Sequence, residues 1–180
     1  MFRFKNKQSI VNVGGVRFGG QPGSLPTVLC GTIFYQGHRI VEDDESGIFD
    51  HAAAERLVIR QIELSGETGC PFVLHIYART VPALLKYLDF TERIWSGPFI
   101  IDSAERSTRS AALSVLSEMG YADRAIFNSI SIATDEAEAR ALLENEVDSA
   151  IILAYNPGVP GVEGAMQILE NGGQVSDEGL

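Results

Sequence analysis

The sequence contains little cysteine, few basic residues and no long apolar segment. Its two cysteines, Cys30 and Cys70, form no Cys-x-x-Cys pair and no metal-ligand spacing, so we expect neither a disulfide framework nor a bound metal. No window approaches the roughly 18 apolar residues that a membrane span requires. The first residues also lack the apolar stretch of a signal peptide. These absences predict a cytoplasmic protein that does not insert into a membrane.

The charge balance excludes a further group of partners. Acidic residues outnumber basic residues 24 to 14, which gives a formal net charge of -10. A protein with this charge repels phosphate backbones and anionic lipid surfaces, so nucleic acid is not an expected partner. The 180 residues, of which 45% are hydrophobic, are enough for one domain with a sizeable core or for a piece of something larger.

Short β-prone runs stand near the start of the chain. Residues 9–13 and 16–18 are joined by Gly14-Gly15, which predicts a β-hairpin because a two-residue turn with positive φ favours glycine. A glycine-rich loop follows. We therefore expect residues 1–25 to form a hairpin and a loop that precede the main domain.

From Pro26 onward, candidate strands alternate with candidate helices. Apolar runs typical of parallel strands covered on both faces occupy residues 27–34, 72–77, 98–101, 124–130 and 149–154. Helical stretches occupy residues 51–64, a run opened by Thr80, residues 104–119 and 134–145, and a weaker run at 162–170. Consecutive βα units of this kind form either a doubly wound sheet or a (β/α) barrel. A barrel needs eight units and about 250 residues, so the chain would hold about five of the eight.

Polar residues and glycines predict where the helices begin and end. Asp50 is expected to cap the first helix and Gly66 to end it. Asp102, with Glu105 three residues later, has the spacing of a capping box. Thr134 is the expected start of the helix that reaches about residue 145.

Polar residues also follow the third, fourth and fifth predicted strands. They are Asp102 and Ser103, Asn128 and Ser129, and Asn156. Because parallel α/β folds bind ligands at the carboxyl ends of their strands, these side chains predict a binding site. A carboxylate accepts a pair of N–H donors and a carboxamide both donates and accepts, which suits an amide-rich heterocycle such as a pterin. A flavin is another possible heterocycle, and the alternative is that the first four residues only cap helices.

The histidines give a weaker signal. His38, His51 and His75 are scattered, and His75 lies inside the second predicted strand. A structural or simply polar role is the prediction for His75. No nucleophile-elbow motif accompanies a Ser/His/Asp or Cys/His order, so covalent hydrolysis has no support.

Several phrases taken together resemble one known family. They are GGV at 14–16, GGQPG at 19–23, PTVL at 26–29, GTIFY at 31–35, GIFD at 47–50, KYL at 86–88, PFIIDS at 98–103, ADR at 122–124, NSI at 128–130, NP at 156–157 and ILENGG at 168–173. These phrases are co-linear over nearly the whole chain. The sequence therefore resembles the family of the H subunit of tetrahydromethanopterin S-methyltransferase, which includes bacterial relatives that use tetrahydrofolate.

The resemblance implies a fold and an activity. The fold is a TIM-type (β/α)8 barrel, of which residues 26–180 would supply about five βα units. The activity is transfer of a methyl group between a tetrahydropterin, either tetrahydromethanopterin or tetrahydrofolate, and the cobalt of a corrinoid protein in one-carbon metabolism. Related pterin-dependent methyltransferases hold the pterin through an Asp after the third strand and an Asn after the fourth, which map onto Asp102 and Asn128.

The resemblance also implies partners. The corrinoid is carried by a separate protein, and the chain is expected to belong to a larger methyltransferase complex or a homo-oligomer. Because the chain matches only the first part of family members, a non-catalytic truncated subunit is the alternative function.

Overall fold

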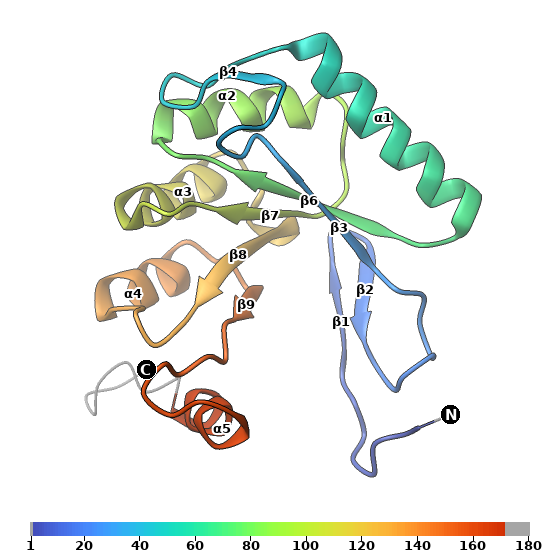
Figure 1. Cartoon of the computed structure of the whole chain (residues 1–180), viewed down its shortest axis with the longest axis vertical. Helices are drawn as coiled ribbons and strands as arrows, with labels where there is room; N and C mark the ends of the chain where they lie inside the picture. The colour runs from blue at the N-terminus through green and yellow to red at the C-terminus, as the bar shows by residue number, and fades with distance from the viewer. Residues whose placement is uncertain (1, 172–180) are drawn as a thin grey trace.

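The computed structural model describes residues 2–171, which form a parallel β-sheet with helices along one side (Figure 1). The sheet strands are β3 (Leu29–Ile33), β6 (Phe72–Tyr77), β7 (Phe99–Asp102), β8 (Ala125–Ile130) and β9 (Ala150–Ile152). They lie in the order β3-β6-β7-β8-β9, and every neighbouring pair is parallel. The predicted α/β class and the sequential strand order are confirmed. Within the described residues the sheet is open, with β3 and β9 at its edges.

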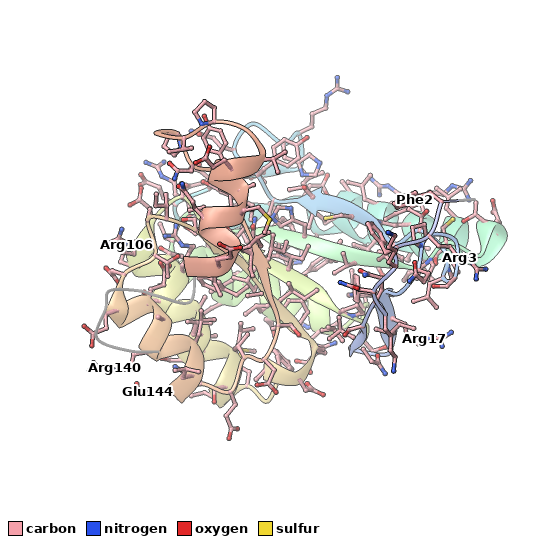
Figure 2. The ribbon with its side chains drawn as sticks, turned by 90° about the horizontal axis from the view of Figure 1, so that it is seen from below. Phe2, Arg3, Arg17, Arg106, Arg140 and Glu144 are labelled. Carbon is pink, nitrogen blue, oxygen red and sulfur yellow. The ribbon has the colours of Figure 1, made fainter. Side chains whose placement is uncertain are left out.

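Helices connect the strands and cover one face of the sheet. They are α1 (His51–Thr68), α2 (Val81–Glu92), α3 (Arg106–Glu118), α4 (Glu136–Glu144) and α5 (Val162–Asn171), with a short 3-10 turn at Ala122–Arg124. In Figure 1, α1 to α4 form an outer layer and the β1–β2 hairpin lies across the sheet from them. Figure 2, seen from below, places Arg106 and Arg140 of the helix layer at the opposite side of the molecule from Arg17 of the hairpin.

The two faces of the sheet have different surroundings. On β6, Leu74 and Ile76 pack into the main core beneath the helices, whereas Val73 belongs to a smaller cluster on the other face. Side chains alternate between the faces of a strand, so β6 needs apolar residues at nearly every position. This two-sided burial explains why the strand has a continuous apolar run.

The smaller cluster is built on the predicted hairpin. β1 (Ile10–Val13) and β2 (Val16–Gly19) pair antiparallel, and both turn glycines have positive φ, 53° at Gly14 and 84° at Gly15. Val13 packs with Val73, Ile100 and Ile126 on the face opposite the helices. A Cβ on Gly14 would lie 2.8 Å from the backbone nitrogen of Pro98, so the hairpin tip sits against the amino end of β7.

The sequence prediction missed one element. β4 (Val41–Asp43) and β5 (Ile48–Phe49) form a second small hairpin between β3 and α1. Its strands are too short to show a periodic pattern. The acidic connection between them reaches the carboxyl end of the sheet, where Thr80 Oγ1 donates to the Glu45 carbonyl at 2.6 Å.

Two predicted helix boundaries were wrong. α1 continues through Gly66 and ends at Gly69, whose φ is 68° and whose N–H donates to the Ser65 carbonyl. α4 is capped by Asp135, which accepts from Glu138 N at 2.9 Å, rather than by Thr134. Thr134 Oγ1 instead accepts a hydrogen bond from the Ser131 N–H at 2.9 Å, inside the preceding turn. Both errors replace one suitable residue by another close to it in sequence.

Tyr87 of α2 gives the core a testable pH dependence. Its ring is fully buried and stacks on Phe34 with 4.1 Å between centroids. Burial, and to a lesser extent the charges of Asp44 and Asp43, raise the pKa of Tyr87 from 10.0 to about 12. The fold therefore favours the neutral phenol, so stability is unaffected below pH 10 and falls as the pH rises from 10 toward about 12.

We expect Tyr87→Phe to reduce this alkaline loss of stability, because it removes the group that ionises. At neutral pH the change should stay within about 1 kcal/mol, since the ring and its packing are retained. Urea unfolding of both proteins at neutral and alkaline pH measures the difference. Tyr155→Phe, at an exposed tyrosine, is the matched control, and an equal effect of both substitutions would contradict the prediction.

Candidate functional site

Asp102 and Asn128 lie side by side at the carboxyl end of the sheet. Asp102 is the last residue of β7 and pairs in register with Asn128 on β8 and with Tyr77 on β6. Neighbouring strands are about 4.8 Å apart, and paired residues point to the same face. Ile101 and Phe127, one position earlier, belong to the core beneath the helices. The carboxylate and the carboxamide therefore face the opposite side of the sheet, together with Tyr77.

Asp102 is held by a histidine from the neighbouring strand. His75 Nε2 lies 3.1 Å from Asp102 Oδ2, and the two side chains are 16% and 26% exposed. The other ring nitrogen, Nδ1, lies 3.0 Å from Thr32 Oγ1 on β3. Three strands thus contribute to one hydrogen-bonded chain on the open face. The predicted capping box is wrong, because the residue at the amino end of α3 is Glu105 and no side chain caps it.

The Asn128 and Ser129 side chains have no hydrogen-bond partner among residues 2–171, and both are partly exposed. Asn128 pairs with Ile151, whereas Ile130 pairs with Ile152, so Ser129 is an extra residue in β8. They do not cap α4, since Asp135 has that position. Their polar atoms are therefore free to contact a ligand at this end of the sheet.

Ser103 and Asn156 are placed differently. Ser103 is 3% exposed, and its Oγ accepts from Glu105 N at 3.2 Å. Asn156 Oδ1 accepts from Gly158 N at 2.9 Å, and its Nδ2 donates to Gln167 Oε1 of α5 at 3.3 Å. Both side chains already form hydrogen bonds close to their own loops. Their roles in ligand binding stay predictions.

A buried ion pair supports this end of the sheet from the helix layer. Arg109 of α3 donates from Nε to Glu138 Oε1 of α4 at 2.8 Å, and its Nη1 donates to the Ser103 carbonyl at 2.9 Å. The Glu138 side chain is 1% exposed and that of Arg109 is 18% exposed. One guanidinium group therefore joins two helices to the loop that directly follows Asp102.

The acidic connection of the second hairpin also contacts this end. Arg79, two residues after β6, lies 3.3 Å from both Asp44 Oδ1 and Glu45 Oε1. The Ser46 hydroxyl and the N–H groups of Ser46 and Glu45 donate to Asp43, which lowers the pKa of its carboxyl below the ordinary value of 3.8. Among the residues that the structure describes, no three His, Cys, Asp or Glu side chains are grouped so as to hold a metal ion.

An apolar hollow of about 440 Å³ lies on the same face, nearer the amino ends of the strands. The hairpin contributes Val13 and Phe18 to its lining, and the sheet contributes Val73, Ile100 and Ile126. In register, Ile100 and Ile126 lie beside His75, one layer below Asp102 and Asn128. The open face is thus apolar at one end and polar at the carboxyl end.

Sequence analysis found Asp102 and Asn128 but not the role of His75. The detectable signal was the alternation of β6, where His75 stands between Val73 and Tyr77 on one face. Its partners are 27 and 43 positions away, so their contact depends on the register of three strands. Sequence periodicity cannot supply that register.

Consecutive βα units with polar side chains at the carboxyl ends of a parallel sheet define an α/β protein of the βα-repeat class, with its ligand site at that end. Residues 6–180 match the family model described as tetrahydromethanopterin S-methyltransferase MtrH subunit. The chain belongs to this family.

Curated relatives match along the whole chain. It is 47% identical over 180 residues to the H subunit of the methyltransferase mtx of Methanosarcina barkeri. It is 43% and 44% identical, again over 180 residues, to the H subunits of tetrahydromethanopterin S-methyltransferase of Methanocaldococcus jannaschii and of Methanothermobacter thermautotrophicus. The match covers 100% of this chain but 58%, 56% and 58% of those three relatives. The chain therefore spans little more than half of their length.

None of the helices within residues 2–171 combines the length and the apolar character needed to cross a membrane.

Proposed function

We propose that the chain supplies the pterin-binding part of a methyltransferase that moves a methyl group between a tetrahydropterin and the cobalt of a corrinoid protein. Family membership and the names of the relatives support pterin-linked methyl transfer. The observation that carries the proposal is the pairing of Asp102 with Asn128 at the carboxyl end of the sheet. An acceptor and a mixed donor–acceptor stand there on adjacent strands.

The polar edge of a pterin matches these two side chains in chemistry. That edge carries ring and exocyclic N–H donors beside a carbonyl oxygen. Asp102 would accept from the N–H donors, because its Oδ1 has no partner in the described part of the chain and each carboxylate oxygen has two lone pairs. Asn128 would donate to, and accept from, the adjacent ring atoms. Ser103, Ser129 and Asn156 are further candidates for contacts at the same end.

The chain would assist methyl transfer by orientation. A methyl group on a ring nitrogen leaves only if that nitrogen gains a proton or a strong hydrogen bond as the carbon departs. Asp102 and Asn128 would fix the plane of the pterin so that its methyl group faces out of the sheet end. The corrinoid of the partner protein supplies the cobalt that accepts or donates the methyl group. A corrin ring is too large to share a barrel mouth with a pterin, so the partner would dock at the carboxyl end.

The same proposal includes the wider architecture. Residues 26–180 would supply five of eight βα units of a TIM-type barrel, and residues 1–25 would cover its amino end. The open edges β3 and β9, together with the longer chains of the relatives, support this arrangement. We place the protein in the cytoplasm, as a subunit of a larger methyltransferase complex or a homo-oligomer.

Calorimetric titration tests the proposed function. We expect N5-methylated tetrahydromethanopterin or tetrahydrofolate to bind, and flavin mononucleotide not to bind, because only the pterin presents donors that match Asp102 beside Asn128. Binding of the flavin alone would contradict the proposal and favour another heterocycle. Pterin binding without methyl transfer to a corrinoid protein, in the full-length context, would favour a non-catalytic subunit.

A further inference from the structure

The proposed pterin site uses Asp102 and Asn128 but gives no role to the side chains that hold Asp102. Thr32, His75 and Asp102 come from three adjacent strands and form one chain of contacts, 3.0 Å from Thr32 Oγ1 to His75 Nδ1 and 3.1 Å from His75 Nε2 to Asp102 Oδ2. Because paired residues of neighbouring strands share a face, Thr32 and His75 lie one layer below Asp102 on the open face.

The contacts determine which ring nitrogen of a neutral His75 carries the proton. The Asp102 carboxylate can only accept, so Nε2 carries the hydrogen. Nδ1 is then a lone-pair acceptor, and the Thr32 hydroxyl donates to it. Thr32 therefore selects the tautomer of His75 that can donate to Asp102.

The hydrogen bond also determines how Asp102 is oriented. Rotation of a carboxylate about its last side-chain bond is broad, so an exposed aspartate at a strand end has no fixed plane. A donor at 3.1 Å on Oδ2 restricts that rotation and leaves Oδ1 without a partner in residues 2–171. Oδ2 keeps a second lone pair, so the pair of oxygens can still accept two N–H donors.

We propose that His75 is a positioning residue, which fixes the Asp102 carboxylate in the orientation that receives the amide edge of a pterin. This inference rests on the proposed function and adds a third strand to the site. His75 is not a catalytic residue, because its ring nitrogens are occupied by Thr32 and Asp102. Its effect on a ligand passes through Asp102.

Titration with N5-methylated tetrahydropterins measures this effect. Histidine to phenylalanine at position 75 (H75F) keeps a ring and removes both hydrogen bonds, and we expect about a tenfold loss of pterin affinity. H75Q should recover most of the loss, because its side-chain amide can donate to Asp102. H51F is the matched control, since His51 stacks on Phe49 at the start of α1 and lies outside the site.

A double-mutant cycle separates positioning from a merely structural role. If His75 acts through Asp102, then H75F should cause little further loss when Asp102 is already asparagine. An equal tenfold loss in the parent and in the D102N background would overturn the inference. So would an H75F protein that binds pterin as tightly as the parent.

Two further measurements keep the inference falsifiable. Nitrogen NMR of the imidazole should show hydrogen on Nε2 in the parent, and hydrogen on Nδ1 alone would overturn the inference. If H75F does not fold, T32V tests the same contacts, and we expect a several-fold weaker pterin affinity because the tautomer is no longer selected; unchanged affinity would overturn it. A parent that binds no pterin overturns the proposed function and the inference with it, whereas a parent that binds with unaffected variants overturns the inference alone.

Discussion

Replacing Asp102 by alanine should weaken pterin binding by about 2 to 4 kcal/mol, which is roughly 30-fold to 1,000-fold in Kd. The reason is that N–H donors on the bound ring lose their acceptor in a partly buried site, where water replaces it poorly. The Asp102 side chain is 26% exposed. Calorimetric titration of a full-length protein with the methylated pterin measures the loss. Asn128→Ala should cost somewhat less, because a neutral partner is removed.

The control for this prediction is an aspartate outside the site. Asp123 lies in the short 3-10 turn after α3, and Asp123→Ala should leave pterin affinity unchanged. Thermal unfolding is measured on every variant. An Asp102→Ala protein that binds the pterin as tightly as the parent while losing stability would show that the carboxylate is structural.

Loss of one member of the buried ion pair should have the largest effect on stability. Arg109→Met leaves the Glu138 carboxylate, 1% exposed, without its guanidinium partner. An unpaired buried charge costs about 3 to 5 kcal/mol of unfolding free energy. We expect urea unfolding of Arg109→Met to shift to much lower concentration. The substitution also removes the hydrogen bond to the Ser103 carbonyl.

Two variants test the physical reason. Replacing both members, Arg109→Met with Glu138→Leu, should recover most of the stability, because no unpaired charge is left. Glu63→Ala breaks a pair with Arg60 whose side chains are 54% and 55% exposed, and it should change stability by less than about 1 kcal/mol. Equal losses for Arg109→Met and Glu63→Ala would contradict this explanation.

The strands were predictable because burial on two faces gives them a continuous apolar run. Residues 72–77 were predicted and β6 covers Phe72–Tyr77. The first hairpin was predictable because its Gly-Gly turn requires positive φ. Helix ends were less predictable, since Gly66 and Gly69, or Thr134 and Asp135, are chemically suitable alternatives. Tertiary position decides between them.

The candidate site was only half predictable. Asp102 and Asn128 stand directly where apolar runs end, so sequence order alone placed them at the carboxyl ends of adjacent strands. His75 stands inside an apolar run, and its value depends on strand register. Nothing local indicates that residues 32 and 102 lie on either side of it. The Arg109–Glu138 pair was missed for the same reason, because it joins two helices 29 positions apart.

During synthesis, each strand of this sheet leaves the ribosome directly after the strand with which it pairs. The sheet can therefore grow from β3 to β9 through neighbours that are close in sequence, which favours fast folding. The β1–β2 hairpin is different, because Val13 packs against Ile100 and Ile126, which are made much later. The hairpin is thus complete first and docks only after β7 and β8 exist. Until then the nascent chain carries its apolar side uncovered, the condition in which chaperones bind.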